Sequence, residues 1–193
     1  MMESMEQRIV EAAISCIEEY GIGSLTIRKI ASKADVNTAA INYYFRSKEQ
    51  LIDRVIEVTL RNAFDWSDLA HTDTLAPREQ LFAILDHLTA GAQQYPHITR
   101  AHFYETLING NYQTRAVKEL NRFLNELYEK FKQKGCAMQE QELRFGIAQA
   151  FMAGLFSVGM MPNICGEFLH VDLTEDAQRK AFLWRIAERS IDA

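Results

Sequence analysis

One stretch, residues 25–51, constrains the fold of this chain more than any other. Apolar residues at one-face helical spacing over residues 27–34 predict a short helix, for which Thr26 is a good N-cap. Asp35 follows, at a sharp turn that asks for a left-handed backbone; Gly adopts that conformation most easily, and Asp better than most other residues. Asn37 then serves as the N-cap of a second short helix.

This second helix spans residues 38–44. Ala40, Ile41 and Tyr44 are expected to face inward, whereas the outward side chains are Thr38, Ala39, Asn42 and Tyr43. Two short helices joined by a turn of about four residues form a helix-turn-helix, whose second helix enters the major groove of DNA. An ordinary helical hairpin is the alternative that this spacing alone leaves open.

The outward residues of the stretch divide by chemistry. We expect base contacts from Arg28, Thr38, Ala39 and Asn42, and phosphate contacts from Thr26, Tyr43 and Lys48, with Asn37 beside them. Lys48 would be helped by the helix N-terminus at which it lies.

The order of residues in this stretch resembles the TetR family of bacterial transcriptional regulators. The resemblance covers roughly residues 8–60 and rests on an ordered string: Ile30-Ala31, Ala34-Asp35-Val36-Asn37, Ile41, Tyr43, Phe45, Ser47-Lys48-Glu49 and Leu51. It implies a three-helix DNA-binding head, a larger helical body for ligand binding and dimerisation, and a ligand-responsive repressor. Most members have Gly at Asp35 and Tyr at Asn42, so we expect a slightly strained turn and an amide contact in place of a common phosphate contact.

The distribution of charge agrees with a DNA-binding head. The chain carries a net charge of −5, but residues 24–48 hold five cations against Asp35 alone and so carry +4, which leaves −9 for the rest. A basic head on an acidic body lets DNA phosphates attract one face and repel the others.

The rest of the chain is also predicted to be helical. With 193 residues, three Pro, nine Gly and few alternating apolar-polar runs, it predicts an all-α protein of about nine helices. We place a DNA-binding domain at residues 1–47 and a ligand-binding and dimerisation domain at residues 48–193. One continuous connecting helix is expected from residue 48 to about residue 69.

A homodimer is predicted from residues 145–161, which have almost no polar face and so must be covered on all sides. The predicted interface comprises Gly146, Ala150, Gly154, Val158 and Phe182. Close packing inside one subunit is the alternative. A symmetric dimer would bind a roughly palindromic double-stranded operator.

An apolar small-molecule effector is the other expected partner, in a pocket beside the connecting helix. The predicted lining is Phe64, Phe82, Phe103, Leu107, Phe123 and Met152. A filled core, with no pocket, is the alternative. Binding there would tilt the connecting helix and change the separation of the two heads of a dimer.

Catalytic and metal-binding patterns are weak in this sequence. The three Cys have no metal-ligand spacing, the five His form no HExxH pair, and neither a glycine-rich phosphate loop nor a GxSxG motif occurs. We therefore expect no enzyme and no cofactor; an enzyme acting on small molecules, or a helical protein-interaction module, is the alternative function. No signal sequence or run of bilayer-spanning length is evident, so we expect a cytoplasmic protein with reduced thiols and no membrane partner.

Overall fold

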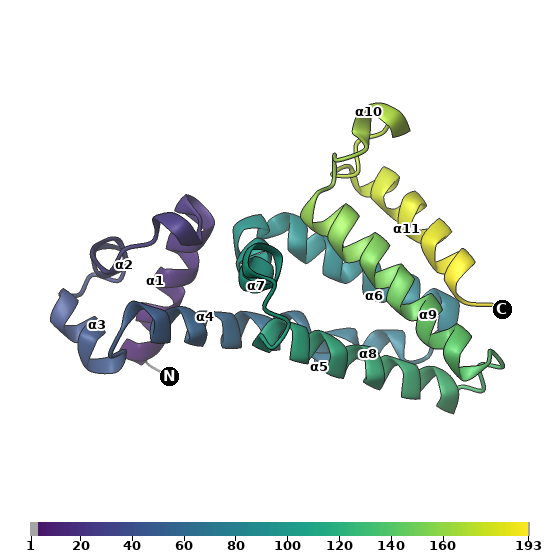
Figure 1. The fold of residues 1–193 in the computed structure, drawn as a ribbon, viewed down its shortest axis with the longest axis horizontal. Coiled ribbons are helices and arrows are strands. Elements are labelled where there is room, and N and C mark those ends of the chain that lie inside the picture. The colour runs from purple at the N-terminus through teal and green to yellow at the C-terminus, as the bar shows by residue number, and fades with distance from the viewer. Residues whose placement is uncertain (1–3, 193) are drawn as a thin grey trace. The chain divides into compact units, whose positions relative to one another are not determined.

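A computed structural model describes residues 4–192, and every regular element in this range is a helix (Figure 1), which confirms the all-α prediction. The elements are α1 Met5–Tyr20, η1 Ile22–Ser24, α2 Ile27–Lys33, α3 Thr38–Tyr44, α4 Lys48–Ala63, α5 Trp66–Leu69, η2 Ala70–Thr72, α6 Pro77–Gln94, α7 Pro96–Asn109, α8 Arg115–Gln133, α9 Glu140–Phe151, the π-helix η3 Met152–Met160, α10 Gly166–Leu169 and α11 Asp176–Ser190.

The helices form two compact units. The head unit contains the chain up to Asn62 together with Tyr95–Val117, and the body unit contains Ala63–Gln94 and the chain from Lys118 onward. These units do not coincide with the predicted domains 1–47 and 48–193, because most of α4 and all of α7 pack with the first three helices.

The core of the head unit explains why α7 belongs to it. Side chains from α1 to α4 converge on one apolar cluster, and Ile98 and Ala101 of α7 are part of the same cluster. Its fully buried members include Ile9, Ala13, Ile17, Ile30, Ile41, Leu51 and Val55. Two residues far along the sequence thus help to bury the apolar sides of α2 and α3.

Glu18 of α1 also ties α7 to the head. Its carboxylate accepts hydrogen bonds from the main-chain N–H groups of His97 (3.1 Å) and Ile98 (3.0 Å), at an N-terminus where Tyr95 provides no side-chain cap. The ring Nδ1–H of His97 donates to the main-chain oxygen of Glu18 at 2.6 Å. A carboxylate at a helix N-terminus satisfies orphan N–H groups and complements the helix dipole.

His102 forms a second link within the head unit. Its Nε2 lies 2.7 Å from Thr59 Oγ1 of α4, and that hydroxyl donates to the main-chain oxygen of Val55 at 2.8 Å. The hydroxyl hydrogen is committed to Val55, so the imidazole Nε2–H donates to Thr59. Burial lowers the pKa of His102 to about 4, so this side chain is neutral at pH 7.

The connecting helix is shorter than predicted. It ends at Ala63, and the separate helix α5 begins at Trp66, so the expected continuous helix to about residue 69 is wrong. Asp65 is the cause, since its Oδ1 accepts from the N–H of Ser67 at 2.8 Å. Such a local side-chain bond offers the backbone an alternative to continued helix.

The aromatic core of the body unit centres on Phe123 of α8. Trp66 stacks on its ring with centroids 4.5 Å apart, and Phe64 and Phe151 lie at 5.1 and 5.9 Å. These aromatic residues pack α5, α8 and α9 together.

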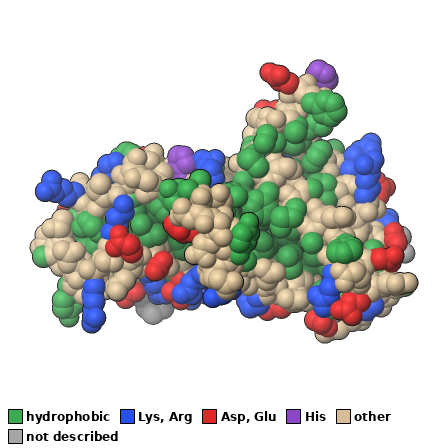
Figure 2. Space-filling model, in the orientation of Figure 1, with side chains coloured by type: hydrophobic (Ala, Val, Ile, Leu, Met, Phe, Trp, Pro, Cys, Tyr) green, Lys and Arg blue, Asp and Glu red, His purple; other side chains and the backbone are tan. Residues whose placement is uncertain are grey.

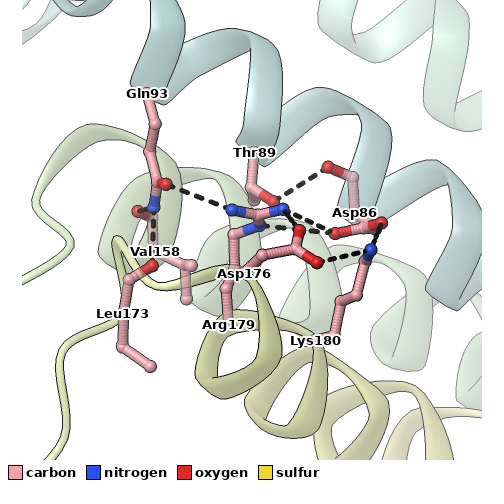
Figure 3. A network of polar contacts seen from close by, with 8 residues as sticks. All are labelled: Asp86, Thr89, Gln93, Val158, Leu173, Asp176, Arg179 and Lys180. Carbon is pink, nitrogen blue, oxygen red and sulfur yellow. Dashed lines mark hydrogen bonds and ion pairs between the residues drawn. The ribbon is translucent and has the colours of Figure 1, made fainter.

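A polar network joins α6 to α11 in the body unit (Figure 3). The buried Arg179 guanidinium bonds Asp86 Oδ1 at 3.2 Å and also Asp176. The side-chain amide of Gln93 donates to the main-chain oxygens of Val158 (3.0 Å) and Leu173 (2.9 Å). The buried charge is therefore paired, and α11 is fixed against α6.

The segment formed by α9 and η3, Glu140–Met160, is long and apolar enough to cross a bilayer, contrary to the expectation that no run reaches this length. However, 56% of its most apolar window is buried inside the protein, and it packs against α6 and α11. These contacts are those of a central helix of the body unit.

Candidate nucleic-acid interface

The helix α2 and the turn after it have the predicted caps. Thr26 Oγ1 accepts from the N–H of Lys29 at 3.3 Å, and Asp35 has a φ of 51° in the left-handed region. Arg28 is exposed on α2. The first half of the helix-turn-helix is therefore confirmed at the level of backbone geometry.

The helix α3 exposes the face that was predicted to read DNA. Asn37 Oδ1 accepts from the N–H of Ala40 at 2.8 Å, and Ile41 is fully buried beneath the helix. The side chains of Thr38, Ala39, Asn42 and Tyr43 are all exposed, Tyr43 to 82%. Tyr44 is also exposed, against expectation, and packs edge-on against Tyr43; Phe45 is the residue that is buried at the end of the helix.

The five cations of residues 24–48 fall into two groups. Lys29 Nζ donates to the main-chain oxygen of Ser24 and lies 4.1 Å from the ring centroid of Tyr20, and Lys33 pairs with Glu19 at 2.7 Å. In contrast, no ion pair joins Arg28, Arg46 or Lys48 to another residue in the range 4–192. Of these five cations, Arg28, Arg46 and Lys48 are therefore the ones available to phosphate.

Lys48 is the first residue of α4 and so lies at a helix N-terminus. Ser47 Oγ accepts from the N–H of Gln50 at 3.2 Å, which starts this 16-residue helix. The main-chain N–H groups at a helix N-terminus favour an anion, and Lys48 belongs to the first turn of this helix.

The residues predicted to line an effector pocket are divided between the two units. Phe103 and Leu107 belong to the head unit, where Phe103 is buried and Leu107 is 58% exposed. The other four belong to the body unit, where Phe64 and Phe123 contact each other, Phe82 packs edge-on against Trp184, and Met152 is 47% exposed. Neither unit alone brings all six together, so the pocket stays a prediction.

An open groove of about 420 Å³ lies along α5 and α8 of the body unit, where Trp66 is its apolar wall. The remaining lining residues are polar or charged: Asn125, Glu126, Glu129, Lys130 and Gln133. Sequence reasoning did not single out these residues, because they occupy the solvent side of an amphipathic helix.

The small residues predicted at a dimer interface pack inside the subunit. A Cβ on Gly146 would overlap the main-chain oxygen of Ser190, and one on Gly154 would lie 2.9 Å from Leu85. Ala150 and Val158 are fully buried, and Phe182 is half-buried. The small residues thus allow α11 and α6 of the same chain to pack closely against α9 and η3. This is the alternative of close packing inside one subunit.

Large apolar side chains remain exposed on the other side of the same helices. Phe145 is 57% exposed, Met152 47% and Trp184 38%. Figure 2 shows hydrophobic side chains gathered over the α9 and α11 region of the body unit. No group of three or more His, Cys, Asp or Glu side chains suited to a metal ion occurs within the described part of the chain.

Comparison with known proteins agrees with this geometry. Residues 9–55 match the bacterial regulatory proteins of the tetR family. The HTH-type transcriptional regulator BetI of Agrobacterium fabrum is 33% identical over 95 residues, which are 49% of this chain and 46% of BetI. The chain spans about half the length of the curated relatives that it matches.

Solved structures match nearly the whole chain. A TetR-like transcriptional regulator from Rhodococcus sp. RHA1 has a TM-score of 0.65 at 18% identity, covering 98% of this chain and 97% of its own. The transcriptional regulator FadR from Bacillus subtilis, solved in complex with stearoyl-CoA, has a TM-score of 0.65 at 17% identity, covering 96% and 98%. At these identities the likeness shows the fold. The sequence match with the tetR family thus covers residues 9–55, and the fold of nearly the whole chain is that of these solved regulators.

Proposed function

We propose that this protein is a sequence-specific, DNA-binding transcriptional regulator. The observation that carries the proposal is the outward face of α3, where Thr38, Ala39, Asn42 and Tyr43 are exposed on a helix fixed from below by the buried Ile41. A helix presented in this way fits the major groove, which displays a distinct donor and acceptor pattern for each base pair.

Around this face we assign the contacts by chemistry. Arg28, Thr38, Ala39 and Asn42 reach base edges, and the phosphates are held by Thr26, Tyr43 and Lys48, next to Asn37. Lys48 has no ion pair with any residue in the range 4–192, and this and its place at the N-terminus of α4 support the phosphate assignment.

A homodimer would place two such heads on a palindromic operator, with α3 helices about 34 Å apart in successive major grooves. Since the small-residue row is filled by α11 and α6, we assign the subunit contact to the exposed side of α9, η3 and α11, around Phe145, Met152 and Trp184. A second copy would remove these large apolar side chains from water.

We further propose a cytoplasmic repressor that an apolar small molecule releases from DNA. The FadR structure in complex with stearoyl-CoA supports this proposal, because a protein of this fold there binds a molecule with a long apolar part. In this chain, Glu18 and His102 bind α7 to the rest of the head unit, so a displacement of α7 would be transmitted to α1 and α4. An effector acts only through its different affinity for the two arrangements.

The proposal is tested by selecting bound sequences from random double-stranded DNA and measuring affinity for the selected operator. We expect a palindromic site, whose affinity falls steeply between about 50 and 200 mM salt because phosphate contacts release counterions. A scrambled site of the same length is the control. Equal affinity for both sequences at every salt concentration would refute a sequence-specific regulator.

A further inference from the structure

Arg8 makes a contact that the DNA-reading face does not explain. Its guanidinium Nη2 donates a hydrogen bond of 2.7 Å to the main-chain oxygen of Ala34, although the two residues are 26 positions apart. Arg8 lies on α1 and is half-buried, whereas Ala34 is the C-cap of α2, immediately before the turn of the helix-turn-helix.

The turn itself has the hydrogen bonds of a Schellman motif. The N–H of Val36 donates to the main-chain oxygen of Ala31 at 3.0 Å, and the N–H of Asp35 donates to that of Ser32 at 3.4 Å. In this motif the residue after the C-cap adopts a left-handed conformation and is usually Gly. Here the residue is Asp35, with a φ of 51°, so a side chain occupies a position where most residues are strained.

The peptide group between Ala34 and Asp35 controls this conformation. Its orientation sets ψ of Ala34, which is −5°, and φ of Asp35. If this peptide rotated, φ of Asp35 could return to negative values and the carbonyl would turn away from Arg8. On the N–H side the peptide is held only by the long bond to Ser32. A cation at the C-terminus of a helix also complements the helix dipole.

We propose that Arg8 is a positioning residue that holds the left-handed turn at Asp35 and thereby sets the direction of α3. The helix α3 begins three residues after Asp35, so a change in this turn would redirect its outward face. Arg8 matters because residue 35 is not Gly. The part of this proposal that is measured by operator affinity rests on the proposed function of DNA binding.

The test is a double-mutant cycle in the full-length chain. Arg8→Ala should raise the operator dissociation constant by about tenfold, the loss typical of a charge-assisted hydrogen bond. In a chain that already carries Asp35→Gly, Arg8→Ala should change the operator dissociation constant by less than about threefold, since Gly adopts the left-handed conformation without support. Arg8→Lys retains a cation and a hydrogen-bond donor, so it should recover part of the lost operator affinity. It replaces Arg8→Ala in the cycle if Arg8→Ala does not fold.

Two measurements separate positioning from direct DNA contact. The dependence of operator affinity on salt concentration should be unchanged in Arg8→Ala. Loss of a phosphate contact would instead lower the slope of log affinity against log salt concentration by about 0.9. Lys33→Ala is the matched control. It removes a cation from the same end of α2, but the ammonium group of Lys33 pairs with Glu19 and not with the turn. Its effect should be the same with Asp or Gly at position 35.

Hydrogen exchange at the amide of Val36 gives a readout that needs no DNA. After correction for intrinsic rates, exchange should be faster in Arg8→Ala and return to the Asp35→Gly rate in the double variant. Unchanged exchange, or equal losses of affinity in both backgrounds, would overturn the role of Arg8. If exchange behaves as expected but the natural chain binds no operator, the proposed function fails and the role of Arg8 stands.

Discussion

Gly146 offers a quantitative test of how the body unit is packed. A methyl group at this position would overlap the main-chain oxygen of Ser190, the last residue of α11. The neighbouring residue Ile191 is fully buried, and its main-chain oxygen accepts from Arg78 Nε at 3.0 Å, so α11 cannot move away without losing these contacts. Gly146→Ala should therefore destabilise the protein by about 1–3 kcal/mol, as other over-packed core sites do.

Gly91 is the matched control for this substitution. It is exposed on α6, and a Cβ there would meet no atom within 4 Å. Gly91→Ala should stabilise the protein by roughly 0.5–1 kcal/mol, because Ala restricts the unfolded chain and favours helix. Both variants are compared by urea denaturation at one protein concentration, so that any dimerisation contributes equally. If Gly146→Ala were as stable as the natural protein, α11 would not lie against α9 at this point.

Three further perturbations address α7 and the subunit contact. The pKa of His102 is about 4 in the folded chain and near 6.5 when unfolded, so the unfolded state binds more protons below pH 6.5. Stability should consequently decrease by up to about 1.4 kcal/mol per pH unit from pH 6.5 to 4; an unaltered slope in His102→Gln would contradict this origin. Glu18→Ala should expose the first N–H groups of α7, and a lack of faster hydrogen exchange there would show that Glu18 is not their cap. Met152→Glu should shift sedimentation from dimer to monomer by placing a charge in an apolar contact, and an unchanged dimer would exclude that face.

Local hydrogen bonding made the head predictable from sequence. Thr26 and Asn37 cap the helices as their residue types indicate, and Asp35 takes the left-handed conformation that the spacing of the two helices requires. These features depend on residues within four positions of each other. The exposed face of α3 follows directly, because once Ile41 is buried the helical period fixes which side chains point outward.

Features that depend on distant contacts could not be predicted in the same way. The sequence does not show that Arg8 reaches Ala34, or that Glu18 supplies the cap of α7. A row of small residues indicates that a helix approaches closely, but not whether that helix belongs to the same chain. The end of α4 was predicted too late for a local reason. The apolar stripe continues beyond Ala63, but Asp65 caps a new helix and so ends the first one.

The central claim is that α3 reads bases while Lys48 holds a phosphate, and one comparison tests it most directly. The salt dependence of operator affinity is measured for the natural chain, Lys48→Ala and Asn42→Ala, on the selected operator and on single-base variants of it. Lys48→Ala should weaken binding to all these sequences equally and lower the salt slope by about one. Asn42→Ala should leave the slope unchanged and lose about 1–3 kcal/mol of discrimination at particular base pairs. Uniform losses across all sequences in both variants would contradict base reading by α3.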